Sequence, residues 1–359
     1  MIRGSHARQA VLAAVIVALL ATAAHAQQNA PPSYIAFAAP GAAPGAVSGT
    51  YATSININGT VAGYFQDSAG VTHGFLRSPN GTFTTVNAPD AGTALGQGTS
   101  ISSINTAGAV AGSYYANSVS YAFVRQADGT FAEFSAPHAS GAPFYGTFAR
   151  SINAAGDVAG SYTDPTGLSH GFVRSSTGTF QSFEIPGGGT GTFASSINDA
   201  GFVTGSYQDV SKVNHGFLRA PNGAITTFDA PVSVNGGQGI LAESINGAGA
   251  IAGYYIDSNY QTHGFVRSSE GAIAGFDVPL AQSTAAWSIN FAGTVTGYCT
   301  IAAVDYAFVR VASGAILKFD NAGIADQGTR GEAINDVGAV TGYYFSGPLN
   351  AIQAFLLTP

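Results

Sequence analysis

The chain has 359 residues, of which 9% are charged, with 19 acidic residues against 12 basic ones and a formal net charge of −7. This acidic balance disfavours nucleic acids and anionic membrane surfaces as partners, because both select for basic patches. The 48 glycines, 23 phenylalanines and 16 tyrosines, beside few helix formers such as Glu and Lys, favour an all-β protein.

The N-terminal segment has the pattern of a secretory signal peptide. A short basic start precedes an apolar run over residues 10–24, and residues 24–26 match the small-x-small rule for cleavage. We expect cleavage after Ala26 and a secreted or periplasmic single domain over residues 27–359, the alternative being a retained membrane anchor. No later apolar run is long enough to insert into a membrane. Cys299 is the only cysteine, so no internal disulfide is expected.

The first element of the mature chain is a short strand without an obvious partner. Residues 34–37 read as a β-strand, and Pro40 closes the segment. Nothing before this strand is suited to pair with it, so its partner must come from elsewhere in the chain.

The rest of the chain is a repeat. An Ile-Asn pair recurs every 44 to 49 residues, ending at Asn56, Asn105, Asn153, Asn198, Asn246, Asn290 and Asn335. The third copy predicts four strands, over residues 148–153, 157–162, 170–174 and 179–185. Glycine ends both tight turns in nearly every copy, as hairpins that need a positive φ require. Short strands at this spacing indicate antiparallel sheets.

Four strands in about 46 residues is the size of one propeller blade. The seventh copy stops at its third strand, over residues 354–357, and the unpartnered strand at 34–37 aligns with a fourth strand such as 83–86. The two ends of the chain would therefore complete one sheet and remove an open edge. The sequence predicts a seven-bladed β-propeller in which the N-terminal strand completes the last blade.

The repeated motif resembles a known family. Ile-Asn-x-x-Gly-x-Val-x-Gly followed by His-Gly-Phe is similar to the HAF-type extracellular repeat, over essentially residues 34–359. His-Gly-Phe begins at His73, His170, His215 and His263, whereas Tyr121, Tyr306 and Gln353 replace the histidine in the other copies. The resemblance implies an exported bacterial repeat protein and brings no catalytic residues with it.

Residues that recur in most copies are expected to be structural. The repeated Asn is expected to bond its own turn. An arginine recurs on the third strand, and we expect it to pair with acidic residues of the fourth strand. The arginines are Arg77, Arg125, Arg174, Arg219, Arg267 and Arg310, and the acids are Glu133, Glu184, Asp229, Asp277 and Asp320.

Four copies share an Asp and a His six residues apart at the two ends of one loop. The pairs are Asp67/His73, Asp164/His170, Asp209/His215 and Asp257/His263. A hydrogen bond that clasps the loop is the favoured interpretation. Four metal sites are the alternative, but two ligands per loop fall short of the three or four that zinc requires. We therefore predict no metal site and no cofactor.

Residues that break the repeat are the candidates for function. Three residues before the repeated Asn stand Thr53, Ser102, Arg150, Ser195, Glu243, Trp287 and Glu332, and two residues earlier stand Tyr51, Ser100, Phe148, Phe193, Leu241, Ala285 and Arg330. Five of these positions carry unusual chemistry in a chain with few charges. Arg150, Glu243, Trp287, Arg330 and Glu332 are the predicted ligand-binding residues. Variable loops nearby add His138, Tyr145, Gln238, Asp326 and Gln327.

These residues are expected at the mouth of the central channel, on the face that carries the variable loops. In one interpretation the two arginines pair with the two glutamates and plug the channel. In the other they form a pocket, in which a tryptophan face suits sugars and arginines suit a carboxylate-bearing ligand.

Two main functions follow, together with a weaker one. The favoured one is an exported binding or interaction module that needs no cofactor, recognises a carbohydrate or another small acidic ligand, and acts as a monomer. The alternative is an extracellular carbohydrate-active enzyme, a polysaccharide lyase or glycoside hydrolase, which would use Glu243 with Glu332, or His138 with Tyr145, for proton transfer. The third is a structural envelope protein. Sequence motifs typical of hydrolases, zinc proteases, phosphate-binding loops and redox proteins do not occur.

Overall fold

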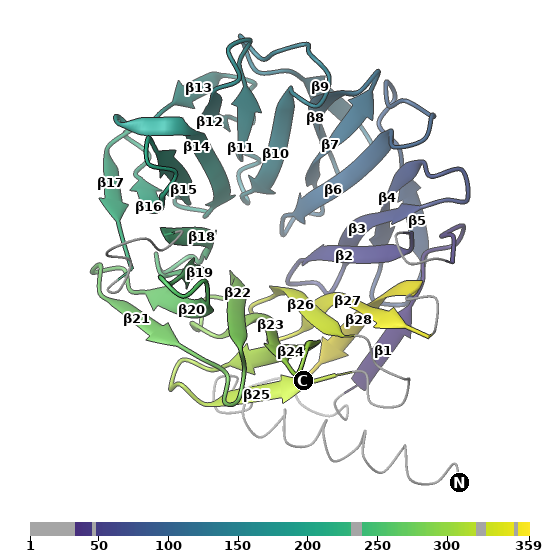
Figure 1. Ribbon diagram of the computed structural model, residues 1–359. Coiled ribbons are helices and arrows are strands. Elements are labelled where there is room, and N and C mark those ends of the chain that lie inside the picture. The colour runs from purple at the N-terminus through teal and green to yellow at the C-terminus, as the bar shows by residue number, and fades with distance from the viewer. Residues whose placement is uncertain (1–32, 45–47, 231–238, 321–327, 348–350) are drawn as a thin grey trace, which may run out of the picture.

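The computed structural model describes residues 33–44, 48–230, 239–320, 328–347 and 351–359. These residues form β-strands that are joined by turns and loops and arranged as a ring of sheets around a central axis (Figure 1). The predicted signal peptide lies outside the described residues. No helix in the described part of the chain is long and apolar enough to cross a membrane.

Each repeat folds as four antiparallel strands in chain order, from the axis to the rim. The innermost strands are β2 (Thr50–Ile55), β6 (Gly98–Ile104), β10 (Thr147–Ile152), β14 (Gly188–Ile197), β18 (Gly239–Ile245), β22 (Ser283–Ile289) and β26 (Thr329–Ile334). The second strands are β3 (Val61–Gln66), β7 (Val110–Ala116), β11 (Val158–Thr163), β15 (Val203–Asp209), β19 (Ile251–Ile256), β23 (Val295–Ile301) and β27 (Val340–Ser346). We number these sets as blades 1 to 7 in this order.

The outer half of each blade contains the shorter strands. The third strands are β4 (Thr72–Arg77), β8 (Val119–Arg125), β12 (Ser169–Arg174), β16 (Asn214–Arg219), β20 (Thr262–Arg267), β24 (Val304–Arg310) and β28 (Ala351–Thr358). The fourth strands are β5 (Phe83–Val86), β9 (Phe131–Phe134), β13 (Phe180–Phe183), β17 (Ile225–Phe228), β21 (Ile273–Phe276), β25 (Ile316–Phe319) and, from the other end of the chain, β1 (Ser33–Phe37).

The N-terminal strand completes blade 7, as the sequence predicts. β1 pairs antiparallel with β28, with Tyr34 opposite Leu357 and Phe37 opposite Ala354. Phe37 also packs in one buried cluster with Phe75 of blade 1 and Leu356 of blade 7. The strand therefore closes the ring through both backbone pairing and a shared core.

The repeated asparagines form a closed ring of hydrogen bonds that the sequence did not reveal. In every blade the side-chain oxygen accepts a bond from the backbone N–H four residues later, which is the predicted turn contact. The side-chain amide donates to the backbone carbonyl of the equivalent Asn in the next blade, over 2.8 to 3.3 Å. Asn335 of the last blade donates to Asn56 of the first at 2.9 Å, so the cycle is complete.

A second set of bonds runs beside the asparagine ring. In blades 1 to 6 the serine two residues before the Asn accepts the backbone N–H of an isoleucine in the following blade, over 3.2 to 3.4 Å. Blade 7 carries Ala333 at this position. The polar inner strands are thus tied blade to blade through groups that burial would otherwise leave unsatisfied.

The core lies between blades. The phenylalanine of the His-Gly-Phe motif and its equivalents are almost fully buried in all seven blades, at Phe75, Phe123, Phe172, Phe217, Phe265, Phe308 and Phe355. Each packs with apolar residues of a neighbouring blade. Because one twisted sheet buries each face only against its neighbours, stacking of the repeats supplies the core.

The predicted pairing of the strand-three arginines with strand-four acids is wrong. Five of these arginines stack instead on a phenylalanine in the fourth strand of the preceding blade, with 4.5 to 5.0 Å between guanidinium carbon and ring centre. Arg125 is the exception, because the preceding blade ends in Val86 at this position, and its nearest ring is Phe131 at 5.9 Å. Antiparallel pairing explains the error: Arg219, at the end of its strand, lies opposite Ile225, whereas the acid follows the far end of that fourth strand.

Candidate functional site

All seven innermost strands contain a β-bulge at the same place. The register against the second strand shifts around Thr53, Ser102, Arg150, Ser195, Glu243, Trp287 and Glu332. These are the residues that the sequence singled out, three positions before the repeated Asn. A bulge places one extra residue on its strand and re-aims that side chain. A position that varies from copy to copy is therefore the one that departs from regular pairing beside the axis.

A glycine that recurs in the second strand of every blade packs against this bulge. In blade 3, Gly160 pairs with Ala149, the residue just before the bulged Arg150. A Cβ on Gly160 would lie 2.1 Å from the carbonyl oxygen of Phe148. The close approach of the two backbones thus demands glycine here, and the equivalent glycines of the other blades meet an inner-strand carbonyl in the same way.

Two of the bulged side chains are carboxyl groups whose pKa is raised. Burial raises the pKa of Glu243 to about 7, against the opposing influence of Arg150. Burial also raises the pKa of Glu332 to about 7, with Arg330 acting in the opposite direction and the charge of Glu243 adding to the rise. These glutamates occupy the same bulged position in blades 5 and 7, on the two inner strands that flank β22 of blade 6.

The two glutamates have no direct polar partner among the described residues. Arg330 donates to Asp305 instead, with both Nε and a terminal nitrogen 2.7 Å from one carboxylate oxygen. The same guanidinium stacks on Tyr298, 4.3 Å from the ring centre. Arg150 is exposed. The interpretation in which two arginines pair with two glutamates is therefore wrong, because Asp305, a residue the sequence did not single out, holds one of the arginines.

Trp287, the bulged residue of blade 6, lies between the two glutamate-bearing blades. Its ring is partly exposed and packs at an angle on Tyr254, with 6.0 Å between ring centres. Its indole Nε1 is buried without a hydrogen-bond acceptor. An aromatic ring flanked by two carboxyl groups is thus present at the axis.

Tyrosines that the sequence reading missed surround these side chains. The residue after the second-strand glycine is a tyrosine in blades 5, 6, 7 and 1 and a serine in blades 2, 3 and 4. The tyrosines are Tyr254, Tyr298, Tyr343 and Tyr64. Each faces the inner strand of a neighbouring blade or its own: Tyr343 lies 5.1 Å from the ring of Tyr51, which stacks on Tyr64 at 4.8 Å. Burial is the main cause that raises the pKa of each of them.

One half of the ring therefore differs chemically from the other. We call Glu243, Trp287, Glu332 and the four tyrosines Tyr64, Tyr254, Tyr298 and Tyr343 the axial cluster. Its members come from consecutive blades 5, 6, 7 and 1. The change from Gly-Ser in blades 2 to 4 to Gly-Tyr in blades 5, 6, 7 and 1 is a signal of this asymmetry in the sequence. The bulges lie within the inner strands, so the cluster lines the axis, and its position at the mouth of the channel stays a prediction.

The loop candidates lie apart from the axial cluster. His138 and Tyr145 are both exposed and belong to the loop between β9 and β10. The Tyr145 hydroxyl lies near Gly167, in a loop of blade 3, whereas the axial cluster belongs to blades 5, 6, 7 and 1. His138 and Tyr145 would therefore form a site separate from the glutamates, and proton transfer by this pair stays a prediction. Gln238, Asp326 and Gln327 lie outside the described residues.

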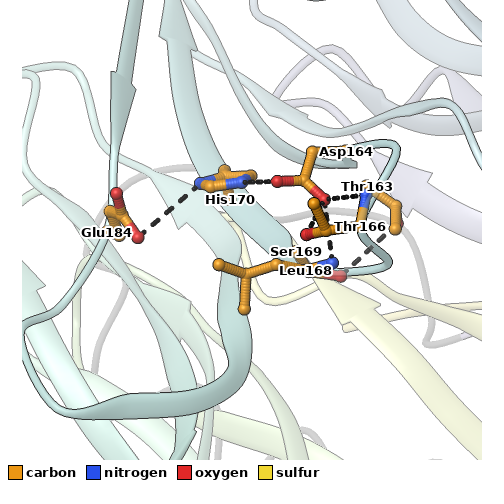
Figure 2. Close-up of polar contacts among 7 residues, drawn as sticks. All are labelled: Thr163, Asp164, Thr166, Leu168, Ser169, His170 and Glu184. Atoms are coloured by element: carbon orange, nitrogen blue, oxygen red, sulfur yellow. Dashed lines mark hydrogen bonds and ion pairs between the residues drawn. The ribbon is translucent and has the colours of Figure 1, made fainter. Parts of the chain in front are cut away.

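The Asp–His clasps are confirmed in all four predicted blades. The His Nε2 lies 3.0 to 3.5 Å from a carboxylate oxygen of the Asp six residues earlier. Figure 2 shows the blade 3 example, in which Asp164 also accepts bonds from the backbone N–H groups of Thr166 and Leu168 and from the Thr166 hydroxyl. These bonds lower the pKa of Asp164. Each clasp thus fixes a loop on the outer part of a blade.

In blades 4 and 5 the second ring nitrogen of the histidine binds the acid that was expected to pair with an arginine, whereas that of His73 in blade 1 bonds Asn87. The Nδ1 of His215 lies 2.6 Å from Asp229, and that of His263 lies 2.9 Å from Asp277. Glu184 lies 3.9 Å from His170 (Figure 2). In the described ranges of the chain, no group of three or more His, Cys, Asp or Glu side chains is arranged to hold a metal ion.

Comparison with solved structures identifies the fold. The virginiamycin B lyase from Staphylococcus aureus superposes with a TM-score of 0.56 at 14% identity, covering 91% of this chain and 100% of that one. The β-propeller domain of the Trilobed protease from Pyrococcus furiosus gives a TM-score of 0.56 at 10% identity, covering 87% of this chain and 94% of that one. The chain is a β-propeller.

A third similarity is to a larger enzyme. A prolyl endopeptidase superposes with a TM-score of 0.57 at 13% identity, covering 98% of this chain but 51% of the endopeptidase. No protein-family model and no curated protein matches the sequence. At these identities the similarity to solved structures shows the propeller fold alone.

Proposed function

We propose that this protein is an exported propeller that binds a carbohydrate at its axial cluster. The observation that carries the proposal is the position of Trp287, a partly exposed aromatic ring between two glutamates that have no direct polar partner. Sugar rings stack on aromatic faces, and their hydroxyl groups donate to carboxylates. The four tyrosines of the cluster extend the aromatic surface, and their hydroxyl groups add further polar contacts.

An acidic ligand is the less favoured form of this proposal. Recognition of a carboxylate or a uronate needs an arginine with free donors. Arg330 already bonds Asp305 and stacks on Tyr298. Among the predicted binding residues, Arg150 is therefore the exposed guanidinium that could bind a carboxylate. A saccharide without carboxylates therefore fits the cluster better than an acidic one.

Binding is tested by glycan-array screening followed by titration of the best ligand, with quenching of Trp287 fluorescence as the signal. Trp287→Ala is expected to lower binding at least tenfold. The matched control is Phe291→Ala, which removes an aromatic side chain, 63% exposed, from the turn after β22 in the same blade. Equal affinity of the Trp287→Ala variant and the wild type, measured by calorimetry, would contradict the proposal.

A second function is favoured by one observation. Glu243 and Glu332 both have a pKa raised to about 7, so one can hold a proton while the other is ionised. Such a pair is suited to general acid and base roles in cleavage of a glycosidic bond. Product analysis after incubation with polysaccharides distinguishes the two functions: new reducing ends or unsaturated uronates that vanish in Glu243→Gln indicate an enzyme, and binding without products indicates a binding protein.

A further inference from the structure

We propose that the ligand of the axial cluster carries a positive charge, as an amino sugar does. The inference rests on the proposed binding function and narrows its ligand class. It starts from an imbalance of charge: Asp305 neutralises Arg330, so Arg150 alone is left against Glu243 and Glu332. A cation that binds between the two glutamates would satisfy carboxyl groups that otherwise lose hydration without gaining a partner.

The aromatic residues point to an organic cation and not to a metal ion. Hard cations such as calcium take six to eight oxygen ligands, and smaller sites for magnesium demand octahedral geometry. The described residues hold no group of three or more acidic, His or Cys side chains suited to a metal. The axial cluster instead surrounds its two carboxyl groups with Trp287 and tyrosines, and ammonium groups are attracted to the faces of such rings.

Affinity for a cation should depend on pH in a defined direction. The titratable and charged groups that interact electrostatically with Glu332 are Arg330, Glu243, Tyr64, Tyr298 and Tyr343. Those that interact with Glu243 are Arg150, Tyr254 and Glu332.

The tyrosines stay neutral near pH 7, because burial raises the pKa of each of them above the ordinary value of 10.0. The arginines stay charged in this range. The two glutamates are therefore the groups that change charge, and cation affinity should rise as the pH increases through about 7.

The test uses pairs of probes that differ in charge. A glucosamine oligomer is compared with the N-acetylglucosamine oligomer of equal length, and choline is compared with its neutral isostere 3,3-dimethylbutan-1-ol. Titrations follow Trp287 fluorescence and heat of binding. We expect each cationic probe to bind at least tenfold more tightly than its neutral counterpart at pH 8. Choline, whose charge does not titrate, should bind at least threefold more weakly at pH 6.

Two variants should act in opposite directions. Glu332→Gln is expected to lower choline affinity at least tenfold and to flatten the pH dependence. Arg150→Ala removes an exposed competing charge and should raise choline affinity severalfold. Because the arginine variant predicts a gain, impaired folding cannot imitate it.

The outcomes separate this inference from the proposed function. Equal binding of cationic and neutral probes, or preference for a galacturonate oligomer, overturns the inference but leaves carbohydrate binding in place. Failure of every saccharide in the glycan screen and in these titrations overturns the proposed function. Binding of choline alone, with no saccharide bound, supports a cation site and rejects the carbohydrate.

Discussion

Replacement of one ring asparagine should destabilise the whole propeller. In Asn198→Ala the N–H of Phe202 loses its acceptor, the side-chain oxygen at 3.0 Å, and the carbonyl of Asn246 loses the side-chain amide at 3.0 Å but keeps the N–H of Gly249. An unsatisfied polar group costs about 1 to 3 kcal/mol and a lost hydrogen bond about 0.5 to 1.5 kcal/mol, so the free energy of unfolding should fall by about 2 to 4 kcal/mol. Equilibrium urea denaturation, followed by Trp287 fluorescence, measures this change.

A variant in blade 7 tests whether the hydrogen bond that joins the last blade to the first contributes to stability. Asn335 makes the same two contacts, at 2.9 Å each, but its amide bonds Asn56 across the joint between the two ends of the repeat array. Asn335→Ala should therefore cost as much as Asn198→Ala. Asn58→Ala is the control, since its amide makes an exposed bond at 3.2 Å to the next blade and its loss should cost less than about 0.5 kcal/mol.

Two results would refute this reasoning. If Asn335→Ala were as mild as the exposed control while Asn198→Ala was costly, the last blade would not be tied to the first in solution. If Asn198→Asp, which keeps the acceptor and loses only the donor to the next blade, matched the wild type, the contact between blades would contribute nothing to stability.

Three further predictions concern the contacts between and within blades. Ala333→Ser should supply the missing serine of the inner ring and raise the free energy of unfolding by up to about 1 kcal/mol, while Ser196→Ala should lower it by a similar amount, both measured by urea denaturation. Arg267→Lys should lower the free energy of unfolding by about 1 to 2 kcal/mol, because lysine cannot form the planar stack on Phe228 of the preceding blade. Arg125→Lys should lower it by less, since Arg125 does not stack on a ring of the preceding blade, and equal losses would contradict the stacking account. Asp164 has a lowered pKa, so its clasp stabilises the fold at pH values above 3.8, the ordinary pKa of Asp, and this stabilisation is lost as the pH falls. The melting temperature of Asp164→Asn should therefore lie below that of the wild type at pH 6 and approach it below about pH 4. A difference that stays constant with pH would argue against the clasp.

The blade plan was predictable because each strand and turn carries its own local signal. The third copy was read as strands over 148–153 and 170–174, and the structure places β10 and β12 within one residue of those limits. The pairing of the first strand with the last followed from a count of strands alone. The Asp–His clasps were predictable for the same reason, since their two ends lie six residues apart on one loop.

The partners of the arginines were not predicted, although the antiparallel register of the third and fourth strands follows from the sequence. Antiparallel register puts the end of the third strand opposite the start of the fourth, which makes His215 and not Arg219 the neighbour of Asp229. Arg219 stacks instead on Phe183 of the preceding blade, which lies 36 residues earlier in the chain. Contacts of this kind depend on how two blades pack, which no single repeat records.

The sequence by itself determined the repeat, its four strands and the way in which its ends meet, because these follow from the period of apolar residues, the turn glycines and the strand count. It also marked the seven inner positions at which the chemistry varies. Only the tertiary structure decided what those positions do. The bulge that re-aims them, the asparagine cycle and the salt bridge between Arg330 and Asp305 all join residues of different blades or different strands. Such contacts are set by register and by the closure of the ring, and these are properties of the folded chain and not of any segment of it.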